Sequence, residues 1–291
     1  MRPQDSINHF LIENSEVRGL IVQLDKTWQT ARQRCEYPAV IEKVLGEAFA
    51  AAVLMSACIK FDGKLTLQVR GTGPVHLLVV QVTRDGVARG LARWESVPSD
   101  ATLQTVFGTD ARMSVSVEAD AMGQPHQGIV ELLGDSLSDA LRNYFKNSEQ
   151  LLTEFYLHVS DDTSAGLLLQ RLPGTASDED GWDRALALAA TVEGDELLSL
   201  DAATILYRLF NQESVRLLDK KDIRFECSCS RERTSGVIQG LGAEEAFEIL
   251  HEQGKISITC EFCAAEYSYD SVDLGTLFSG SAATENPQTR H

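Results

Sequence analysis

The sequence predicts an α+β protein in three parts: an α/β layer core with an antiparallel-type sheet, a helical linker and a small C-terminal domain that holds four cysteines. Three observations lead to this fold class. Strand-like segments joined by tight turns dominate the first 176 residues, and such hairpin turns favour antiparallel pairing. An acidic stretch with helical apolar stripes follows. Four of the six cysteines then lie in the last quarter of the 291-residue chain.

The core is predicted over residues 1–176. After a strand at 17–24, Pro38 marks the start of a long helix. Its apolar residues recur at helical spacing as far as Met55, which predicts burial on more than one side. Alternating segments bounded by turn residues predict further strands. These lie at 64–70, 75–82, 87–93, 113–118, 128–132, 154–159 and 165–172, with an amphipathic helix at 136–150.

The linker is predicted over residues 177–226. From Asp178 to Glu226 it holds twelve acidic and six basic residues. Helical apolar stripes lie at 186–190 and at 203–210, and Asp201 stands at the N-cap position of the second stripe. Short helices are marginal in water on their own, so these are expected to be metastable and ordered only when docked on a neighbour. An ordinary helical connector that never undocks fits the same pattern.

The cysteine-containing domain is predicted over residues 227–278, and the small polar residues 279–291 are predicted to form a disordered tail. The four cysteines form a C-x-C pair and a C-x-x-C pair, separated by thirty residues: Cys227, Cys229, Cys260 and Cys263. Between the pairs, residues 243–253 predict a helix that ends at Gly254. Predicted strands at 255–259 and 266–269 place the C-x-x-C pair at the tip of a hairpin.

This cysteine pattern predicts a closed, structural zinc site in which all four thiolates are ligands. The hairpin tip brings two sulfurs to one side of a tight turn, and no histidine lies nearby at ligand spacing. Unrelated buried cysteines, a redox dithiol, an iron–sulfur cluster and a nucleic-acid-binding zinc module are the alternatives. Three basic against six acidic residues over 227–263 argue against the last of these.

The zinc domain is short, so zinc binding and folding are expected to be one event. Oxidation of the thiolates to disulfides would expel the metal and remove its stabilisation. The other two cysteines, Cys35 and Cys58, stand alone. Cys58 lies at the end of the apolar helix and is expected in the core, while Cys35 is flanked by charged residues. Neither is assigned a role.

Composition and motifs exclude several classes of function. The chain has 43 acidic and 26 basic residues and a formal net charge of −17, which disfavours nucleic acid and membrane surfaces as partners. The N-terminal residues do not resemble a signal peptide, and no charge-free run is long enough to span a bilayer. We therefore predict a soluble, cytoplasmic protein.

We also predict that the protein is not an enzyme, because it has no P-loop, zinc-protease or nucleophile-elbow motif. Its six histidines are scattered along the chain. The GTG sequence at 71–73 is followed by a proline and lies between predicted strands. It therefore predicts a hairpin turn rather than a phosphate-binding loop.

The cysteine motifs with their flanking residues resemble the HslO family of redox-regulated chaperones, the thirty-three-kilodalton chaperonin family of heat-shock proteins. The resemblance spans residues 7–278. It is carried by CSCSRER at 227–233 and CEFC at 260–263, and also by LTLQVRGTGP at 65–74, YFKNSEQL at 144–151, AGLLLQ at 165–170 and the segment 197–210. Some members carry an extra cysteine just after the C-x-C motif, where this chain has Thr234.

The resemblance implies a holdase that works without ATP hydrolysis. Such a protein is inactive when reduced and bound to one zinc ion per chain. Oxidants then release the zinc, and the implied disulfides are Cys227–Cys229 and Cys260–Cys263. The zinc-binding region and linker unfold, the chain forms a homodimer and binds unfolded client proteins, and clients later pass to DnaK-type chaperones. The rival hypotheses are a dithiol–disulfide oxidoreductase that uses Cys260 and Cys263, and a static zinc-binding adaptor.

Overall fold

The computed structural model describes residues 5–59, 63–119, 126–174, 178 and 180–279. The chain divides into a larger compact unit, Met1–Glu226, and a smaller one, Cys227–His291. The predicted linker therefore belongs to the same compact unit as the core. The predicted tail lies outside the described residues except for Ser279, which ends a helix.

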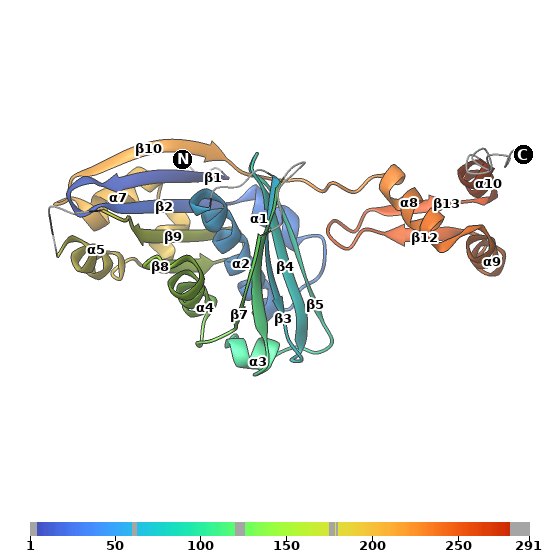
Figure 1. The fold of residues 1–291 in the computed structure, drawn as a ribbon, viewed down its shortest axis with the longest axis horizontal. Coiled ribbons are helices and arrows are strands. Elements are labelled where there is room, and N and C mark those ends of the chain that lie inside the picture. The colour runs from blue at the N-terminus through green and yellow to red at the C-terminus, as the bar shows by residue number, and fades with distance from the viewer. Residues whose placement is uncertain (1–4, 60–62, 120–125, 175–177, 179, 280–291) are drawn as a thin grey trace, which may run out of the picture. The chain divides into compact units, whose positions relative to one another are not determined.

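The larger unit contains two antiparallel sheets (Figure 1). The first, sheet A, has the order β10-β1-β2-β9-β8. Its strands are β10 (Val215–Asp222), β1 (Ser6–Ile12), β2 (Val17–Leu24), β9 (Ser164–Arg171) and β8 (Thr153–Val159). The second, sheet B, has the order β11-β5-β4-β3-β6-β7. Its strands are β11 (Arg224–Phe225), β5 (Val87–Trp94), β4 (Val75–Thr83), β3 (Gly63–Arg70), β6 (Arg112–Ala119) and β7 (His126–Glu131). Among the strands that the structure describes, only the short β11 pairs in parallel, with β5.

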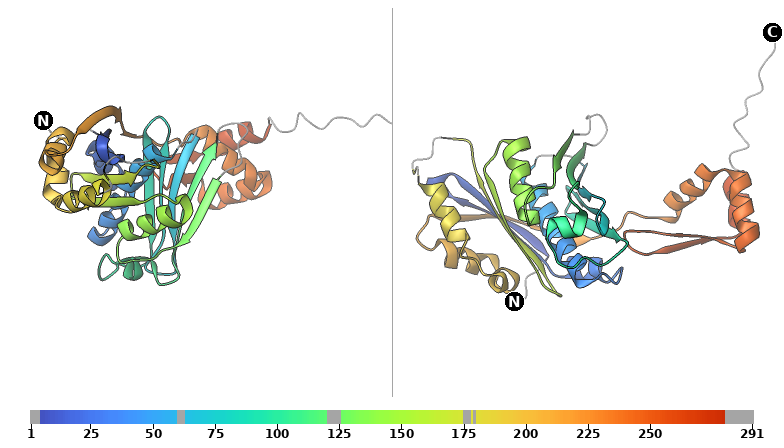
Figure 2. Two further views of the ribbon diagram at one scale, coloured as in Figure 1. Left: turned by 60° about the vertical axis from the view of Figure 1, so that its left-hand side comes forward. Right: turned by 90° about the horizontal axis from the view of Figure 1, so that it is seen from below.

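The long helix α2 (Ala39–Cys58) lies between the two sheets and contacts strands of both (Figure 2). Its residues from Ala48 to Met55 are all fully buried, which confirms the prediction of a helix buried on more than one side. Two strand glycines allow this close packing. A Cβ atom on Gly90 would come within 2.8 Å of Phe49, and one on Gly166 within 2.8 Å of Leu54.

Shorter helices complete this layer. The predicted helix at 136–150 forms α4 (Leu137–Tyr144), which begins at a capping box made by Ser136 and Asp139 and continues as a π-helical turn, η2 (Phe145–Glu149). The remaining helices of this part were not predicted from the sequence. They are the 3-10 turn η1 (Glu13–Ser15), α1 (Lys26–Arg32) and α3 (Leu103–Phe107).

Three helices cover the other face of sheet A: α5 (Gly181–Ala189), α6 (Gly194–Ser199) and α7 (Ala202–Phe210). Figure 2 shows this layer on the side of sheet A opposite α2 and α4. The α5–α7 layer and the sheet enclose a second apolar cluster, in which Phe10 packs against Phe210 with ring centroids 5.9 Å apart. The two predicted helical stripes are therefore confirmed in α5 and α7.

The last part of the predicted helical linker forms a strand instead. Residues of β10 pair with β1, and their side chains are almost all exposed, Leu217 and Leu218 by nearly half. The register shifts between Asn8 and Phe10, which makes a β-bulge. Backbone pairing with a distant strand stabilises β10, and a hydrophobic pattern cannot reveal such pairing.

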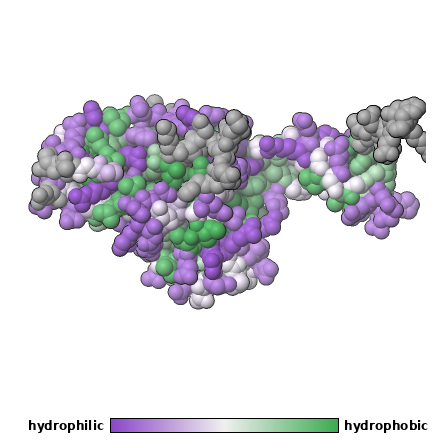
Figure 3. Space-filling view, viewed as in Figure 1, coloured by the Kyte–Doolittle hydropathy of each residue, from purple (hydrophilic) through white to green (hydrophobic). Residues whose placement is uncertain are grey.

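Hydrophilic side chains dominate the visible face of the larger unit (Figure 3).

The described part of the smaller unit, residues 227–279, consists of a hairpin and three helices. The predicted helix at 243–253 is α9 (Ala243–Gln253), and the predicted hairpin is β12 (Ile256–Thr259) with β13 (Glu266–Tyr269). The helices α8 (Arg231–Leu241) and α10 (Ser271–Ser279) were not predicted. The described residues enclose one small apolar cluster, whose buried members are Ile238, Ala246, Ile256, Tyr269 and Leu274.

Candidate metal centre

The four cysteines of the two motifs meet in the smaller unit. Cys227 and Cys229 lie in an extended segment before α8, while Cys260 and Cys263 lie in the turn between β12 and β13. All four sulfur atoms are within 4.8 Å of one another. The Sγ atoms of Cys227 and Cys260 are 3.6 Å apart, and those of Cys229 and Cys263 are 3.3 Å apart. Each of these close pairs joins the two motifs.

These distances fit a tetrahedral metal site. Four thiolates at about 2.3 Å from a central zinc ion are roughly 3.8 Å from one another. A disulfide would bring two sulfurs to about 2.05 Å, and all four cysteines have free thiols. The site is therefore able to bind a metal ion, and the chemistry of four soft sulfur donors suits zinc.

The turn that carries Cys260 and Cys263 has the geometry of a zinc knuckle. The Cys260 N–H donates to the Ala265 carbonyl at 2.9 Å, and the Ala264 N–H donates to the Cys260 carbonyl at 2.8 Å. Ala264 has a φ of 55° and so adopts the left-handed conformation. This tight fold points the backbone N–H groups of Phe262 and Cys263 at the Cys260 sulfur. Such donors stabilise a thiolate.

Burial and hydrogen bonding act in opposite directions on the thiols. Partial burial raises the pKa of Cys260, and it raises the pKa of Cys263 to about 12, although backbone N–H donors lower both. Partial burial also tends to raise the pKa of Cys229. There, a hydrogen bond from Tyr267 and contacts with the other three thiols outweigh it and lower the pKa to about 7. Cys229 is therefore the thiol of these three that loses its proton most readily.

Tyr267 also contacts the candidate site, a contact that was not predicted from the sequence. Its hydroxyl donates to the Cys229 sulfur at 3.1 Å. The signal was present in the predicted strand, because alternation along 266–269 puts Tyr267 and Tyr269 on one face. Tyr269 is buried and donates to the Arg231 carbonyl at 2.8 Å.

Arg231 connects the C-x-C segment to the hairpin. Its guanidinium lies 4.4 Å from the centre of the Tyr269 ring, donates to the Ser268 carbonyl at 3.0 Å and pairs with Asp273 at 2.7 Å. Arg233, in the first turn of α8, reaches back to the C-x-C segment and donates to the Ser228 carbonyl at 2.9 Å. These contacts hold the start of α8 against β13, so the two cysteine pairs stay close.

The other sequence candidates lie in the larger unit. Cys35 is exposed. Cys58 was predicted in the core; it packs against the core cluster but is only half-buried. Burial raises the pKa of its thiol to about 12. The GTG sequence forms the predicted turn between β3 and β4. Its glycines are needed because a Cβ atom on Gly71 would lie 1.9 Å from the Phe107 carbonyl oxygen.

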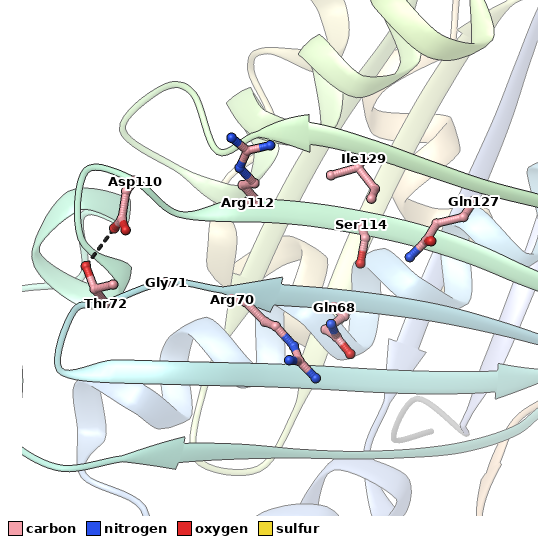
Figure 4. Close-up of a pocket in the computed structure, with 9 residues that line it drawn as sticks. All are labelled: Gln68, Arg70, Gly71, Thr72, Asp110, Arg112, Ser114, Gln127 and Ile129. Carbon is pink, nitrogen blue, oxygen red and sulfur yellow. Dashed lines mark hydrogen bonds between the residues drawn. The ribbon is translucent and has the colours of Figure 1, made fainter.

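A groove of about 470 Å³ lies beside this turn on sheet B (Figure 4). Thr72 donates to Asp110 at its rim at 2.7 Å. Arg70 and Arg112 are cross-strand neighbours there, and Figure 4 shows their guanidinium groups pointing in different directions. The groove is lined by Gln68, Arg70, Gly71, Thr72, Asp110, Arg112, Ser114, Gln127 and Ile129. None of these is a cysteine or a histidine, so the groove is separate from the metal centre.

In the part of the chain that the structure describes, no helix combines the length and the apolar character needed to cross a membrane.

Comparisons with known proteins agree with one another. A family model described as Hsp33 protein matches residues 5–270. The 33 kDa chaperonin of Nitrosococcus oceani is 41% identical over 291 residues and covers 100% of both chains. That of Hahella chejuensis is 43% identical over 277 residues, which are 94% of this chain and 97% of the relative.

A solved structure has the same fold. The crystal structure of the 33 kDa chaperonin (heat shock protein 33 homolog) of Thermotoga maritima aligns with a TM-score of 0.84, covering 96% of this chain and 99% of that chain. The two sequences are 20% identical.

Proposed function

This chain belongs to the Hsp33 family of chaperones, and from that premise we propose that it is a redox-regulated holdase. It binds unfolding proteins and prevents their aggregation under oxidative stress. The observation that carries the redox part of the proposal is the meeting of four thiols within 4.8 Å in the smaller unit.

In the reduced state, Cys227, Cys229, Cys260 and Cys263 hold one zinc ion. Structural zinc contributes on the order of 10–16 kcal/mol of apparent binding free energy in small zinc-binding peptides. The apolar cluster in the described part of the smaller unit has five buried members, too few to give much stability alone. Zinc therefore stabilises this unit, and its loss unfolds it.

Oxidation removes the ligands. A thiolate attacks hydrogen peroxide and breaks the O–O bond, which gives a sulfenic acid and releases hydroxide. A second thiol then displaces water from that sulfur to form the disulfide. Each disulfide thus transfers two electrons from two thiols to one peroxide. The proposed pairs are Cys227–Cys229 and Cys260–Cys263. The two closest sulfur contacts join different pairs, Cys227 with Cys260 and Cys229 with Cys263, so peptide mapping of the oxidised chain tests this pairing directly.

Unfolding of the smaller unit then extends into residues 177–226. If the α5–α7 layer leaves sheet A, the apolar cluster that includes Phe10, Trp182 and Phe210 becomes exposed. A large exposed apolar surface is what binds unfolded chains. We also propose that the oxidised chain forms a homodimer, passes clients to DnaK-type chaperones and works in the cytoplasm without catalysing a reaction.

Light scattering from a thermally unfolding client protein tests the proposal. The chain is added either zinc-loaded and reduced or after peroxide treatment, and zinc release is followed with a chromogenic chelator. We expect only the oxidised sample to suppress aggregation, with zinc released in parallel. Equal behaviour of the two samples would overturn the redox switch and leave a static zinc-binding protein.

A further inference from the structure

A buried glutamine connects sheet A to the α5–α7 layer. Gln23 lies on β2 and is 3% exposed. Its side-chain amide donates to the Leu197 carbonyl at 2.8 Å and to the Leu200 carbonyl at 2.7 Å. Both hydrogens of the amide are therefore used on the last turn of α6.

These two carbonyls need an external donor. The last carbonyl groups of a helix have no N–H partner within the helix. Beyond α6 the chain turns into α7, where the N–H groups of Thr204 and Ile205 both donate to Asp201. Leu197 is fully buried, so water does not replace Gln23 at the Leu197 carbonyl, whereas Leu200 is half-buried.

The other contacts of the layer with sheet A are mainly apolar. Apolar contacts have little directionality, whereas two hydrogen bonds from one planar amide fix both the position and the rotation of α6. At the start of α6 the packing is also close, since a Cβ atom on Gly194 would lie 2.7 Å from His158 Nδ1. Tyr156 on β8 also donates to the Leu186 carbonyl of the layer, and at 3.4 Å this hydrogen bond is longer.

We propose that Gln23 is the positioning residue that holds α6, and with it the α5–α7 layer, on sheet A. Its two hydrogen bonds set how readily this layer detaches. The regulatory consequence rests on the proposed function: weaker attachment lowers the amount of oxidant needed for activation. The attachment itself does not depend on that function and is measured separately.

Hydrogen exchange on the full, reduced, zinc-loaded chain tests the attachment. Gln23→Met keeps the length of the side chain and removes both donors. We expect amides of residues 194–210 to exchange roughly tenfold faster than in the wild type, while those of β9 stay unchanged. Unchanged exchange over 194–210 would overturn the proposal. Should this variant fail to fold, Gln23→Asn, whose amide is one carbon shorter, tests the same bonds.

Gln170→Met is the matched control. Gln170 is also buried on sheet A, at 1% exposure, and its amide donates to Thr153 at 2.9 Å. It makes no hydrogen bond to the α5–α7 layer among the described residues. Gln170 lies on β9, so this variant can change the exchange of β9 amides. We expect the amides of residues 194–210 to exchange no faster, relative to the wild type, than those of β9. A selective increase there would show that loss of any buried glutamine loosens the layer, which contradicts a specific role of Gln23.

Gln23→Glu separates hydrogen bonding from space filling. An ionised carboxylate has the shape of the amide but places oxygens against two carbonyl oxygens. We expect faster exchange over 194–210 than in Gln23→Met, whereas a purely steric role predicts no difference between the two variants.

Peroxide titration of client aggregation then tests the consequence. We expect Gln23→Met to reach half-maximal protection at a lower peroxide concentration than the wild type, and an unchanged midpoint would contradict the regulatory role. If the oxidised wild type fails to protect the client, the proposed function falls, while the exchange result on Gln23 stands.

Discussion

The larger unit packs α2 between two sheets, with every residue from Ala48 to Met55 fully buried, whereas the described part of the smaller unit encloses a cluster of five buried side chains. The larger unit has enough apolar surface to fold without a metal. The smaller unit gathers four thiols instead. The difference teaches that one chain can contain a region stabilised by its apolar core and a region that, in the proposed function, depends for its stability on the oxidation state of its sulfurs.

Removal of zinc is the strongest way to test this contrast. A high-affinity chelator, or Cys260→Ser, removes up to about 10–16 kcal/mol of binding free energy from the smaller unit. We expect amides of residues 231–279 to lose protection from hydrogen exchange while α2 keeps its own. Retained protection in the smaller unit without zinc would show that its apolar cluster is sufficient.

A cavity in the larger unit tests the contrast from the other side. Phe49 is fully buried on α2, and its ring centroid lies 6.0 Å from that of Trp28. Phe49→Ala is expected to lower the free energy of unfolding of the larger unit by about 3–5 kcal/mol. Chemical denaturation measures this loss. Zinc content should stay the same, and release of zinc from this variant would contradict independent stability of the two units.

A half-buried carboxyl gives the larger unit its own pH dependence. Loss of solvation raises the pKa of Glu47 on α2 from its ordinary value of 4.5 to about 7. The unfolded chain therefore loses this proton at lower pH than the folded chain, and stability falls as pH rises from about 4.5 to 7. Glu47→Gln should stabilise the larger unit by about 1–3 kcal/mol at pH 8. Little gain in stability is expected at pH 4. Thermal unfolding of the variant and the wild type at both pH values measures the two gains, and equal gains would exclude titration of Glu47 as the cause.

Tyr267→Phe sharpens the comparison within the smaller unit. The variant loses the hydrogen bond to the Cys229 sulfur but keeps the ring. We expect zinc affinity to fall roughly tenfold, as for other groups that hydrogen-bond to metal ligands, when measured by competition with a chelator. Tyr269→Phe is the comparison variant, since Tyr269 bonds the Arg231 carbonyl rather than a sulfur. A larger loss of affinity in Tyr269→Phe would assign the main supporting role to that side chain.

Ala264→Gly should have the smallest effect. A φ of 55° costs an alanine up to about 1 kcal/mol that a glycine does not pay. The variant is expected to bind zinc slightly more tightly, and weaker binding would mean that unfolded-state entropy outweighs the relief of strain.

Local patterns predicted most of the elements that carry a periodic apolar face. The range of α9 and the hairpin around Cys260 and Cys263 follow from such patterns and from turn residues. The strands β1 and β10 were not predicted. They stabilise each other across more than two hundred residues of sequence, and β10 buries almost no side chain. The helix α8 was not predicted because its sequence is mostly polar or glycine and shows no periodic apolar face.

In the candidate site, too, local patterns predicted some features and not others. Cysteine identity and spacing predicted all four sulfurs that meet. Alternation along 266–269 indicates only the face of the strand on which Tyr267 lies. The hydrogen bonds made by the Tyr267 hydroxyl and by the Gln23 amide were not predicted, because the pattern does not show which distant backbone group or sulfur a polar side chain reaches. Partner choice of that kind is decided by tertiary packing, which strand alternation alone does not specify.

The bulged edge of sheet A has a consequence for self-association. In the described part of the chain β10 has β1 as its only strand neighbour, so its outer backbone groups form an open edge. A bulge and the cationic side chains of Arg216, Lys220 and Lys221 lie along that edge. Such features discourage a further strand from adding to a sheet. If this chain holds aggregating proteins as proposed, it carries on its own sheet features that oppose growth into cross-β fibrils.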